Sequence, residues 1–396
     1  MEVVPYMKLG GDKFILTSFL IWRLTLFFIV FLGIAILTLQ KYFLGGGLDN
    51  YLKNPYFWSL LNFDGEHYAA IALNGYQPLT YFFFPLYPLL ARFVASLINK
   101  DFITIAISGV LVSNLAFLIG LFGLWKLIRL DYKDRIAKLT ILLLLLFPTS
   151  FYFGAFYTEG LAFALIVWSF YFARTKKWFL CGIFGALATA TRITALALVP
   201  ALAIEFFHQR QSPITNYHSL ITSVNFKKVL CFFLIPTGLT AYMYYLYRVT
   251  GDPLEFIHNV SIFGEQRSSS LVVLPQVFYR YIFKVLPNIN YSYLPIVFTT
   301  YLEIVSAGLF LVLGILSFYK LRLSYALFFA AGYLIPPLSG SFSSFPRYVL
   351  ILFPAFLLAA IFLEGQSRFI KMAVCLILLV LLFLSFGFFA RGYWVS

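Results

Sequence analysis

Residues 14–39 read FILTSFLIWRLTLFFIVFLGIAILTL, a mainly apolar run that contains one charged residue, Arg23. An α-helix needs about 20 consecutive apolar residues to cross the hydrocarbon core of a bilayer, so this run predicts a transmembrane helix. Across the 396 residues, 62% of the side chains are apolar and only 11% are charged. A soluble domain carries about 25% charged residues. The composition therefore excludes a water-soluble globular protein and predicts an integral membrane protein.

Apolar runs of similar character recur along the rest of the chain. They occupy residues 102–128, 139–153, 159–173, 229–247, 296–319, 324–338, 348–363 and 369–390. Together with the run 178–207, which we interpret below as two short helices, they predict an all-α multi-pass membrane protein with about eleven transmembrane helices. The sequence shows no obvious internal repeat, and this disfavours a transporter built from duplicated halves.

Basic residues indicate which helix ends face the cytoplasm. One cluster follows the run 102–128 and another follows the run 159–173; they comprise Lys126, Arg129, Lys133, Arg135, Lys138, Arg174, Lys176 and Lys177. Because loops rich in Lys and Arg stay on the cytoplasmic side, both clusters and the N-terminus are expected inside. Residues 40–101 then form a large first outer loop with short interfacial helices, and residues 248–295 form a second outer loop. This topology accounts for the net charge of +14, so no nucleic-acid partner is predicted.

The interval 178–207 determines the topology of the second half. Its midpoint carries three threonines and Arg192. A single helix would place this arginine at mid-bilayer, at a cost of about 2.5–3.5 kcal/mol on insertion scales. Two short helices joined near residues 189–194 would open these polar groups to outside water. We therefore expect a re-entrant hairpin near 178–207 within one transmembrane domain, residues 1–396, in which residues 102–247 and 296–390 supply the helices after the first.

The first outer loop contains a dense cluster of ionisable groups, Asp64, Glu66 and His67. If a helix starts near Phe63, Asp64 and His67 are three positions apart and share a face, whereas Glu66 points elsewhere. Asp64 is then a candidate general base at the membrane–water boundary. A helix N-cap is the structural alternative for this residue. The three side chains could also hold a divalent ion, but they lack a further ligand and we predict no metal site.

An aromatic segment, YFFFPLYPLLAR at residues 81–92, follows in the same loop. Pro85 and Pro88 bracket part of it, and proline fixes the backbone angle φ at each of these positions. The segment therefore forms either a rigid corner that seats the loop on the helix bundle or one wall of a substrate groove.

These motifs resemble those of a known family. Residues 63–76, FDGEHYAAIALNGY, and the FFFPLYP that follows resemble the first-loop signature of the PIG-V family, which comprises GPI mannosyltransferase II enzymes and their prokaryotic relatives. Later segments are similar to further family motifs in the same order: YTEG at 157–160, LATATR at 187–192, GDPLEF at 251–256, and FPRY at 345–348 with FP at 353–354. Two positions depart from the pattern. Phe63 replaces a tryptophan, and Glu265-Gln266-Arg267 stands where relatives often carry Trp-x-Arg.

The resemblance implies a GT-C glycosyltransferase whose active site faces away from the cytoplasm. Such enzymes transfer a sugar from a polyprenyl- or dolichyl-phosphate donor with inversion, and an acid of the first outer loop is the usual base. Asp64 is the expected base in this chain, with Glu66 and Glu159 as further catalytic candidates. An inverting transfer also needs positive charge on the leaving phosphate. Arg192 and Arg347, expected at outer helix ends, can supply it because a guanidinium binds phosphate oxygens bidentately. The structural alternative for each is an arginine that snorkels to the interface or binds backbone carbonyls.

The substrate groove is expected to combine side chains from several outer segments: His67, Tyr68, Tyr76, Pro85, Tyr87, Asp252, Arg267 and Tyr348. The family name implies that the transferred hexose is mannose, and the acceptor is a glycolipid, a glycan or a protein. Membrane lipids and the lipid-phosphate sugar are the expected partners, no cofactor is certain, and a divalent metal stays an option. The compact loops favour a prokaryotic plasma membrane with the active site outside; the lumenal face of the ER membrane is the eukaryotic equivalent.

Two other function classes fit parts of the pattern. A flippase or transporter of lipid-linked sugars would also explain intramembrane arginines and an aromatic groove, but it predicts internal symmetry. A non-catalytic subunit of a glycosylation complex would explain the motifs without chemistry, and it predicts that Asp64 tolerates substitution.

Overall fold

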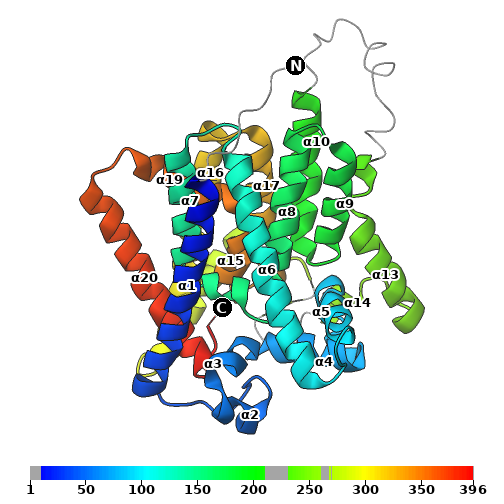
Figure 1. The fold of residues 1–396 in the computed structure, drawn as a ribbon, viewed down its shortest axis with the longest axis vertical. Helices are drawn as coiled ribbons and strands as arrows, with labels where there is room; N and C mark the ends of the chain where they lie inside the picture. Colours follow the sequence, from blue (N-terminus) through cyan, green and yellow to red (C-terminus); the bar gives the residue numbers. More distant parts are fainter. Residues whose placement is uncertain (1–9, 210–230, 260–266, 269, 396) are drawn as a thin grey trace, which may run out of the picture.

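The structure of the protein is a computed structural model that describes residues 10–209, 231–259, 267–268 and 270–395. The regular elements in these residues are helices and helical turns (Figure 1). Four helices are long and apolar enough to cross a membrane: α1 (Gly10–Ile36), α6 (Phe102–Ile128), α16 (Leu294–Lys320) and α20 (Arg368–Ala390). The predicted all-α membrane fold is thereby confirmed.

Shorter helices complete the bundle between these spans. They are α7 (Asp134–Leu146), α8 (Glu159–Arg174), α9 (Trp178–Thr189), α10 (Leu198–His208), α13 (Thr237–Thr250), α17 (Leu323–Leu334) and α19 (Phe353–Glu364). The predicted helix 348–363 is broken, because α18 (Phe345–Tyr348) and η9 (Val349–Ile351) meet α19 at an angle of 81°. Pro354 lies in the first turn of α19, where a residue without an N–H is tolerated, and a new helix can start there. The exact count of eleven transmembrane helices is not confirmed.

The interval 178–207 is also interrupted. Helix α9 ends at Thr189, and the turn η4 (Ile193–Ala197) leads into α10. Between them Arg192 has extended backbone angles, φ −156° and ψ 143°. The side-chain hydroxyl of Thr189 donates a hydrogen bond of 2.6 Å to the carbonyl oxygen of Ile235, just before α13. The break therefore takes Arg192 out of helical geometry, while the end of α9 stays attached to the neighbouring segment.

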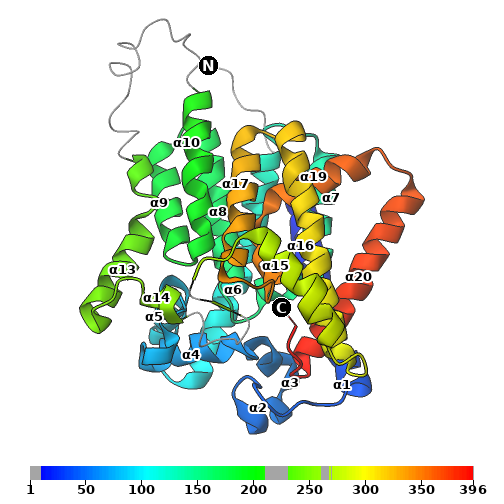
Figure 2. The ribbon, with the colours of Figure 1, turned by 180° about the vertical axis from the view of Figure 1, so that it is seen from behind.

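The first outer loop folds into a layer of short helices at one end of the bundle, drawn in blue to cyan at the bottom of Figure 1. Its elements are α2 (Gly47–Lys53), α3 (Pro55–Trp58), η1 (Ser59–Leu61), α4 (Asp64–Asn74), η2 (Pro78–Thr80) and α5 (Leu86–Ser96). Figure 2 shows α14 (Glu255–His258) and α15 (Leu274–Arg280) from behind. The π turn η6 (Tyr281–Val285) and η7 (Leu286–Asn288) follow α15, and η8 (Pro336–Ser339) follows α17. The two outer segments predicted from the sequence thus meet at the same end as α18.

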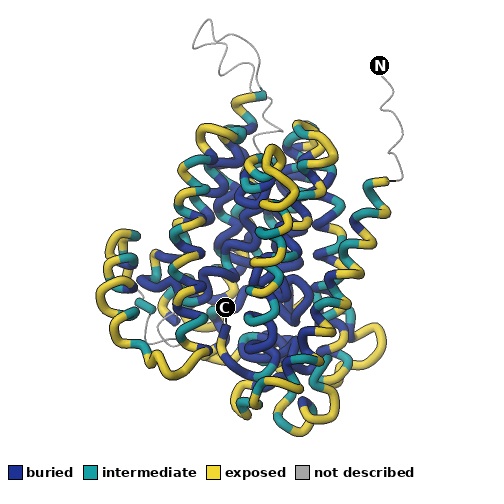
Figure 3. The backbone as a smooth tube through the Cα atoms, turned by 90° about the vertical axis from the view of Figure 1, so that its left-hand side faces the viewer, coloured by how far each residue is buried: buried dark blue, intermediate teal, exposed yellow. Residues whose placement is uncertain are grey.

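The core of the protein surrounds α8, and Figure 3 shows this buried interior flanked by exposed outer helix faces. Gly160 allows α8 to approach α6 and the turn η3 (Ser150–Gly154) closely. A Cβ atom at this position would lie 2.6 Å from the carbonyl oxygen of Ser113 and 2.7 Å from that of Phe153. Because real Cβ atoms do not come so near to backbone oxygen atoms, any larger residue would push α8 away. The glycine therefore lets the preceding residue, Glu159, lie deep in the bundle.

An ionic cluster ties the helices together at the opposite end. Arg174, the last residue of α8, donates two hydrogen bonds of 2.6 and 2.8 Å to Asp131. Glu205 of α10 accepts from Ser324 at 2.7 Å and from Arg322 at 3.1 Å. This cluster fixes α8, α10 and α17 relative to one another. It lies at the end of these helices opposite the layer of short helices.

Candidate active site

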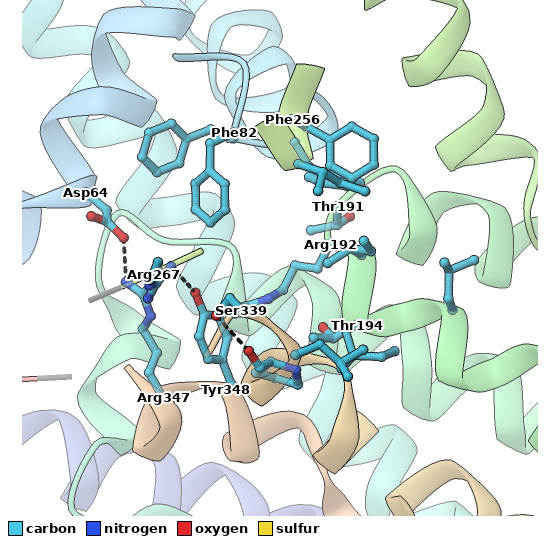
Figure 4. Close-up of a pocket in the computed structure, with 18 of the residues that line it drawn as sticks. Asp64, Phe82, Thr191, Arg192, Thr194, Phe256, Arg267, Ser339, Arg347 and Tyr348 are labelled. Carbon is cyan, nitrogen blue, oxygen red and sulfur yellow. Dashed lines mark hydrogen bonds and ion pairs between the residues drawn. The ribbon is translucent and has the colours of Figure 1, made fainter. Parts of the chain in front are cut away.

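A cavity of about 340 Å³ opens at the end of the bundle that carries the short helices of the first loop. The segment 82–84, the break before η4, helix α14, residues 267, 268, 270 and 271, η8 and α18 contribute its walls (Figure 4). Asp64, Arg192, Arg267 and Arg347 all line it, although they come from four distant stretches of the chain. The cavity therefore gathers one acid and three cations in a lining that is otherwise mainly apolar and aromatic.

Asp64 is the first residue of α4 and faces this cavity. The N-cap position of α4 is occupied by Phe63, whose backbone has a left-handed φ of 58° and whose side chain cannot cap the helix. Asp64 Oδ2 instead accepts a hydrogen bond of 2.7 Å from Arg347 Nη1. The side chain of Asp64 keeps 17% of its surface exposed, against 6% for Arg347. The carboxylate thus joins a buried cation on one side and reaches the open cavity on the other.

A second acid, Glu159, lies behind the arginines at the start of α8. It is only 1% exposed and accepts a hydrogen bond from Arg192 Nη1. The same nitrogen atom donates a hydrogen bond of 3.2 Å to the hydroxyl of Thr158. The same carboxylate lies 3.4 Å from Arg347 Nε. The four side chains therefore form an alternating row in the order Asp64, Arg347, Glu159, Arg192, which we call the acid–arginine row.

Arg267, from the second outer segment, lines the same cavity but is bound differently. Its guanidinium donates to the Tyr348 hydroxyl at 3.4 Å, to the carbonyl oxygen of Ser343 at 3.1 Å and to the Ser344 hydroxyl at 3.4 Å. Within the described part of the chain it forms no ion pair with a carboxylate. The Tyr348 ring also lies 5.0 Å from the Arg192 guanidinium, so it separates the two cations.

Three of the residues predicted for the groove do line the cavity: Tyr68, Arg267 and Tyr348. The others lie behind its walls. The His67 ring stacks on Phe83 at 5.2 Å, the Tyr76 hydroxyl donates to the Phe83 carbonyl at 2.6 Å, and the Tyr87 hydroxyl donates to the Gly109 carbonyl at 3.0 Å. Pro85 precedes α5 as its N-cap residue. These four residues hold the aromatic segment in place without lining the cavity. Phe82, Phe83 and Phe84 of that segment form the cavity wall.

Two further acids lie outside the cavity lining. Burial raises the pKa of the Glu66 carboxyl, although hydrogen bonds from the backbone N–H groups of Gly47 and Gly46 oppose this shift. Asp252 pairs with His258. The pKa of the Asp252 carboxyl is lowered, mainly because the backbone N–H of Leu254 donates a hydrogen bond to it. In the described chain the group of three side chains whose ligand atoms could share a metal ion is Asp252, Glu255 and His258, with these atoms within 4.8 Å of one another. The trio Asp64, Glu66 and His67 does not form such a group there.

Several cavity residues were missed by the sequence analysis. Thr194 and the apolar Leu196 lie just beyond the LATATR segment, and Ser268 and Ser270 lie just beyond Arg267. Proximity to a motif was the one available signal for each of them. Glu265 and Gln266, where the chain departs from the family pattern, lie outside the described residues.

Comparison with solved structures identifies the class of fold. The structure of ArnT from Cupriavidus metallidurans bound to undecaprenyl phosphate is similar with a TM-score of 0.51 and 16% identity, covering 92% of this chain and 62% of that one. Its apo structure gives 0.52 and 16%, with 91% and 61% covered. The Archaeoglobus fulgidus oligosaccharyltransferase gives 0.47 and 11% identity, with 96% and 55% covered. The fold is that of the GT-C membrane glycosyltransferases, and the chain spans about three fifths of the ArnT length.

The family follows from the sequence comparison. The model of the mannosyltransferase (PIG-V) family matches residues 34–291, so this chain belongs to that family, as the motifs predicted. No curated protein matches the chain.

Proposed function

We propose that the protein transfers a hexose from a polyprenyl- or dolichyl-phosphate donor to an acceptor on the non-cytoplasmic side of the membrane, with inversion. The observation that carries this proposal is the acid–arginine row beside a cavity of about 340 Å³ at the outer end. Membership of a mannosyltransferase family and the ArnT-like fold support it. Such a row supplies both an acid–base group and positive charge for a leaving phosphate.

Asp64 is the base in this proposal. It is the more exposed of the two acids, at 17% against 1% for Glu159. Arg347 occupies its Oδ2, whereas Oδ1 makes no hydrogen bond within the described chain and can accept the proton of the acceptor hydroxyl. The acceptor oxygen then attacks the anomeric carbon as the bond to the phosphate oxygen breaks. Glu159, enclosed by Arg192 and Arg347, keeps the two arginines in place.

The charges favour a donor with one phosphate. Of the three arginines that line the cavity, Arg192 and Arg347 form ion pairs with two carboxylates, Asp64 and Glu159. Arg267 forms no ion pair in the described chain, although it interacts electrostatically with the buried Glu303. Counted over the ion pairs, the surplus is one positive charge. A lipid-phosphate sugar is a phosphodiester with one negative charge, whereas a diphosphate linkage carries two. Desolvated charge must be balanced at low dielectric, so the single-phosphate donor fits better.

The apolar wall suits the lipid of the donor. Leu196, Ile335 and Leu338 also line the cavity. They can bury the first isoprene units of the lipid while its phosphate stays beside the guanidinium groups. We propose mannose as the sugar, a glycolipid, glycan or protein as the acceptor, and a prokaryotic plasma membrane, or the lumenal side of the ER membrane, as the location.

The test is transfer in proteoliposomes. Purified protein is reconstituted with radiolabelled polyprenyl-phosphate mannose and membrane-derived acceptors, and labelled product is extracted and counted. Asp64→Asn is expected to lower turnover by about 10²–10⁴-fold, the usual contribution of a general base, while the protein still binds donor. Asp49→Asn, which changes an exposed acid of the same outer loop, serves as the matched control and should retain wild-type turnover.

Two results would contradict the proposal. Full turnover of the Asp64→Asn variant would show that Asp64 is not the base. Movement of the donor across the bilayer without sugar transfer would identify a flippase instead. A protein that neither binds donor nor transfers sugar would fit a non-catalytic subunit.

A further inference from the structure

Thr194 carries a hydroxyl group that the folded chain does not use. The residue belongs to the turn η4 and is 3% exposed. Its Oγ1 is buried and has no hydrogen-bond partner among the residues that the structure describes. The same side chain lines the cavity, next to Arg192 in Figure 4. Thr194 thus borders the space in which we place the substrate, and its buried hydroxyl is unsatisfied.

Other buried threonines nearby do satisfy their hydroxyl groups. Thr191 Oγ1 donates to the carbonyl oxygen of Leu187 at 2.8 Å. Thr189 Oγ1 donates to the carbonyl oxygens of Ala186 at 3.0 Å and Ile235 at 2.6 Å. Since buried polar groups in native proteins are nearly always hydrogen-bonded, the orphaned group at Thr194 indicates a partner that comes from outside the chain.

We propose that Thr194 Oγ1 donates a hydrogen bond to a phosphate oxygen of the lipid-linked donor; this inference rests on the proposed function. In an inverting transfer the attacking oxygen and the leaving phosphate lie on opposite sides of the anomeric carbon. In Figure 4 Asp64 lies on one side of the cavity, and Arg192 and Thr194 lie on the other. A base at Asp64 therefore places the phosphate near Thr194, and the sugar between them.

The chemistry of this position fits a phosphate oxygen. The Arg192 Nη1 atom already donates to Glu159 and to Thr158. The neighbouring Thr194 hydroxyl can therefore give the phosphate a hydrogen bond that this nitrogen atom cannot make. Hydrogen bonds to charged oxygens are roughly twice as strong as those between neutral groups. Thr194 is thus a binding residue of the donor, and it takes no part in proton transfer.

The test uses Thr194→Val, which keeps the side-chain shape and removes the hydroxyl. We expect the affinity for polyprenyl phosphate, measured by ligand binding in detergent micelles, to fall about tenfold. The KM for the sugar-bearing donor should rise by the same factor, with kcat nearly unchanged. The unfolding temperature should stay the same or rise, because the variant no longer buries an unpaired hydroxyl. Thr194→Ser should restore the affinity.

Thr189→Val is the matched control, since it changes the same residue type five positions earlier. Its hydroxyl is satisfied and it does not line the cavity, so the opposite response is expected: a lower unfolding temperature and unchanged affinity. Unchanged affinity in Thr194→Val would overturn the inference, as would a loss of stability like that of Thr189→Val. A loss for the sugar-bearing donor alone would assign the hydroxyl to the sugar and also overturn it. If the wild type binds polyprenyl phosphate but transfers no sugar, the proposed function fails while the binding test of Thr194 still stands; if the wild type does not bind it, both fail.

Discussion

Glu303 provides the most informative perturbation of the site from outside the cavity. This acid of α16 is 6% exposed, and its Oε2 accepts a hydrogen bond of 2.9 Å from the Tyr281 hydroxyl. The backbone N–H of Ser344 also donates to the carboxyl group. Tyr281 in turn lies 3.2 Å from the hydroxyl of Ser341. One acid thus connects the second outer segment to the turn 341–344.

That turn presents two of the cavity arginines. Ser344 has a left-handed φ of 66°, which a serine adopts only when other contacts hold it. Its carbonyl oxygen accepts the N–H groups of Arg347 and Tyr348, each at 3.1 Å, and so starts α18. Arg267 is bound to the same turn through Ser343 and Ser344. Loss of the acceptor at position 303 should therefore release the turn and misplace Arg267.

Two variants separate the acceptor from the shape of the side chain. Glu303→Gln keeps an oxygen acceptor and should cost less than about 1.5 kcal/mol of stability, the value of one ordinary hydrogen bond. Glu303→Leu leaves two buried donors unpaired at about 1–3 kcal/mol each, so about 2–6 kcal/mol in total. Thermal melts in detergent compare the two variants with the wild type.

The transfer assay tests the link to Arg267. Arg267 supplies the surplus positive charge of the cavity, and an interaction with a charged group contributes about 1.5–3 kcal/mol, so Arg267→Ala should raise the donor KM by about 10- to 100-fold. Glu303→Leu should approach this value, and the double variant should be no worse than Arg267→Ala alone, because both changes remove the same contact. Equal behaviour of the Gln and Leu variants, or effects that multiply in the double variant, would refute this reasoning.

Two more predictions concern acids away from the cavity. Glu205 is 1% exposed and pairs with Arg322, so Glu205→Ala breaks a buried ion pair, a change that costs about 3–5 kcal/mol. The unfolding temperature should fall sharply while the donor KM of the surviving folded protein stays constant, and a changed KM would show coupling between the two ends. Burial raises the folded-state pKa of Glu66 above its unfolded value, so this group lowers stability as the pH rises through the folded pKa. Melts of Glu66→Gln from about pH 4 to 7 should show a stability gain that grows with pH, and a constant difference would contradict this.

The chemistry of the site was readable from the sequence more fully than its geometry. Asp64 was predicted as the base, and Arg192 and Arg347 as phosphate-binding groups. Charged side chains beside apolar membrane runs are energetically costly, and they therefore indicate a functional site. Their contact distances fit a common site. The order within the row was not predictable, since the packing of α8 decides that Glu159 lies between the two arginines. The close approach at Gly160 that allows this packing has no signature in a single sequence.

Other features escaped for similar physical reasons. Glu303 is an isolated acid inside an apolar run. Its partner Tyr281 precedes it by 22 positions. Its other partner, Ser344, follows α17 in the sequence. The helix count was uncertain because apolar helices of 10–17 residues, such as α9 and α17, have the composition of a span without its length. The bend of 81° before α19 likewise divides a run that hydropathy alone reads as continuous.

In the proposed reaction, the ion pair between Asp64 and Arg347 changes its charge during the transfer. Before transfer the guanidinium of Arg347 is neutralised by the carboxylate of Asp64. When Asp64 takes the proton of the acceptor, it loses its negative charge and its hold on Arg347. At that moment the departing lipid phosphate changes from a diester to a monoester and gains negative charge. In this proposal, proton transfer to Asp64 frees Arg347 in the same step in which cleavage of the bond between the anomeric carbon and the phosphate oxygen adds negative charge to the phosphate, so the charge of the site changes at both places together.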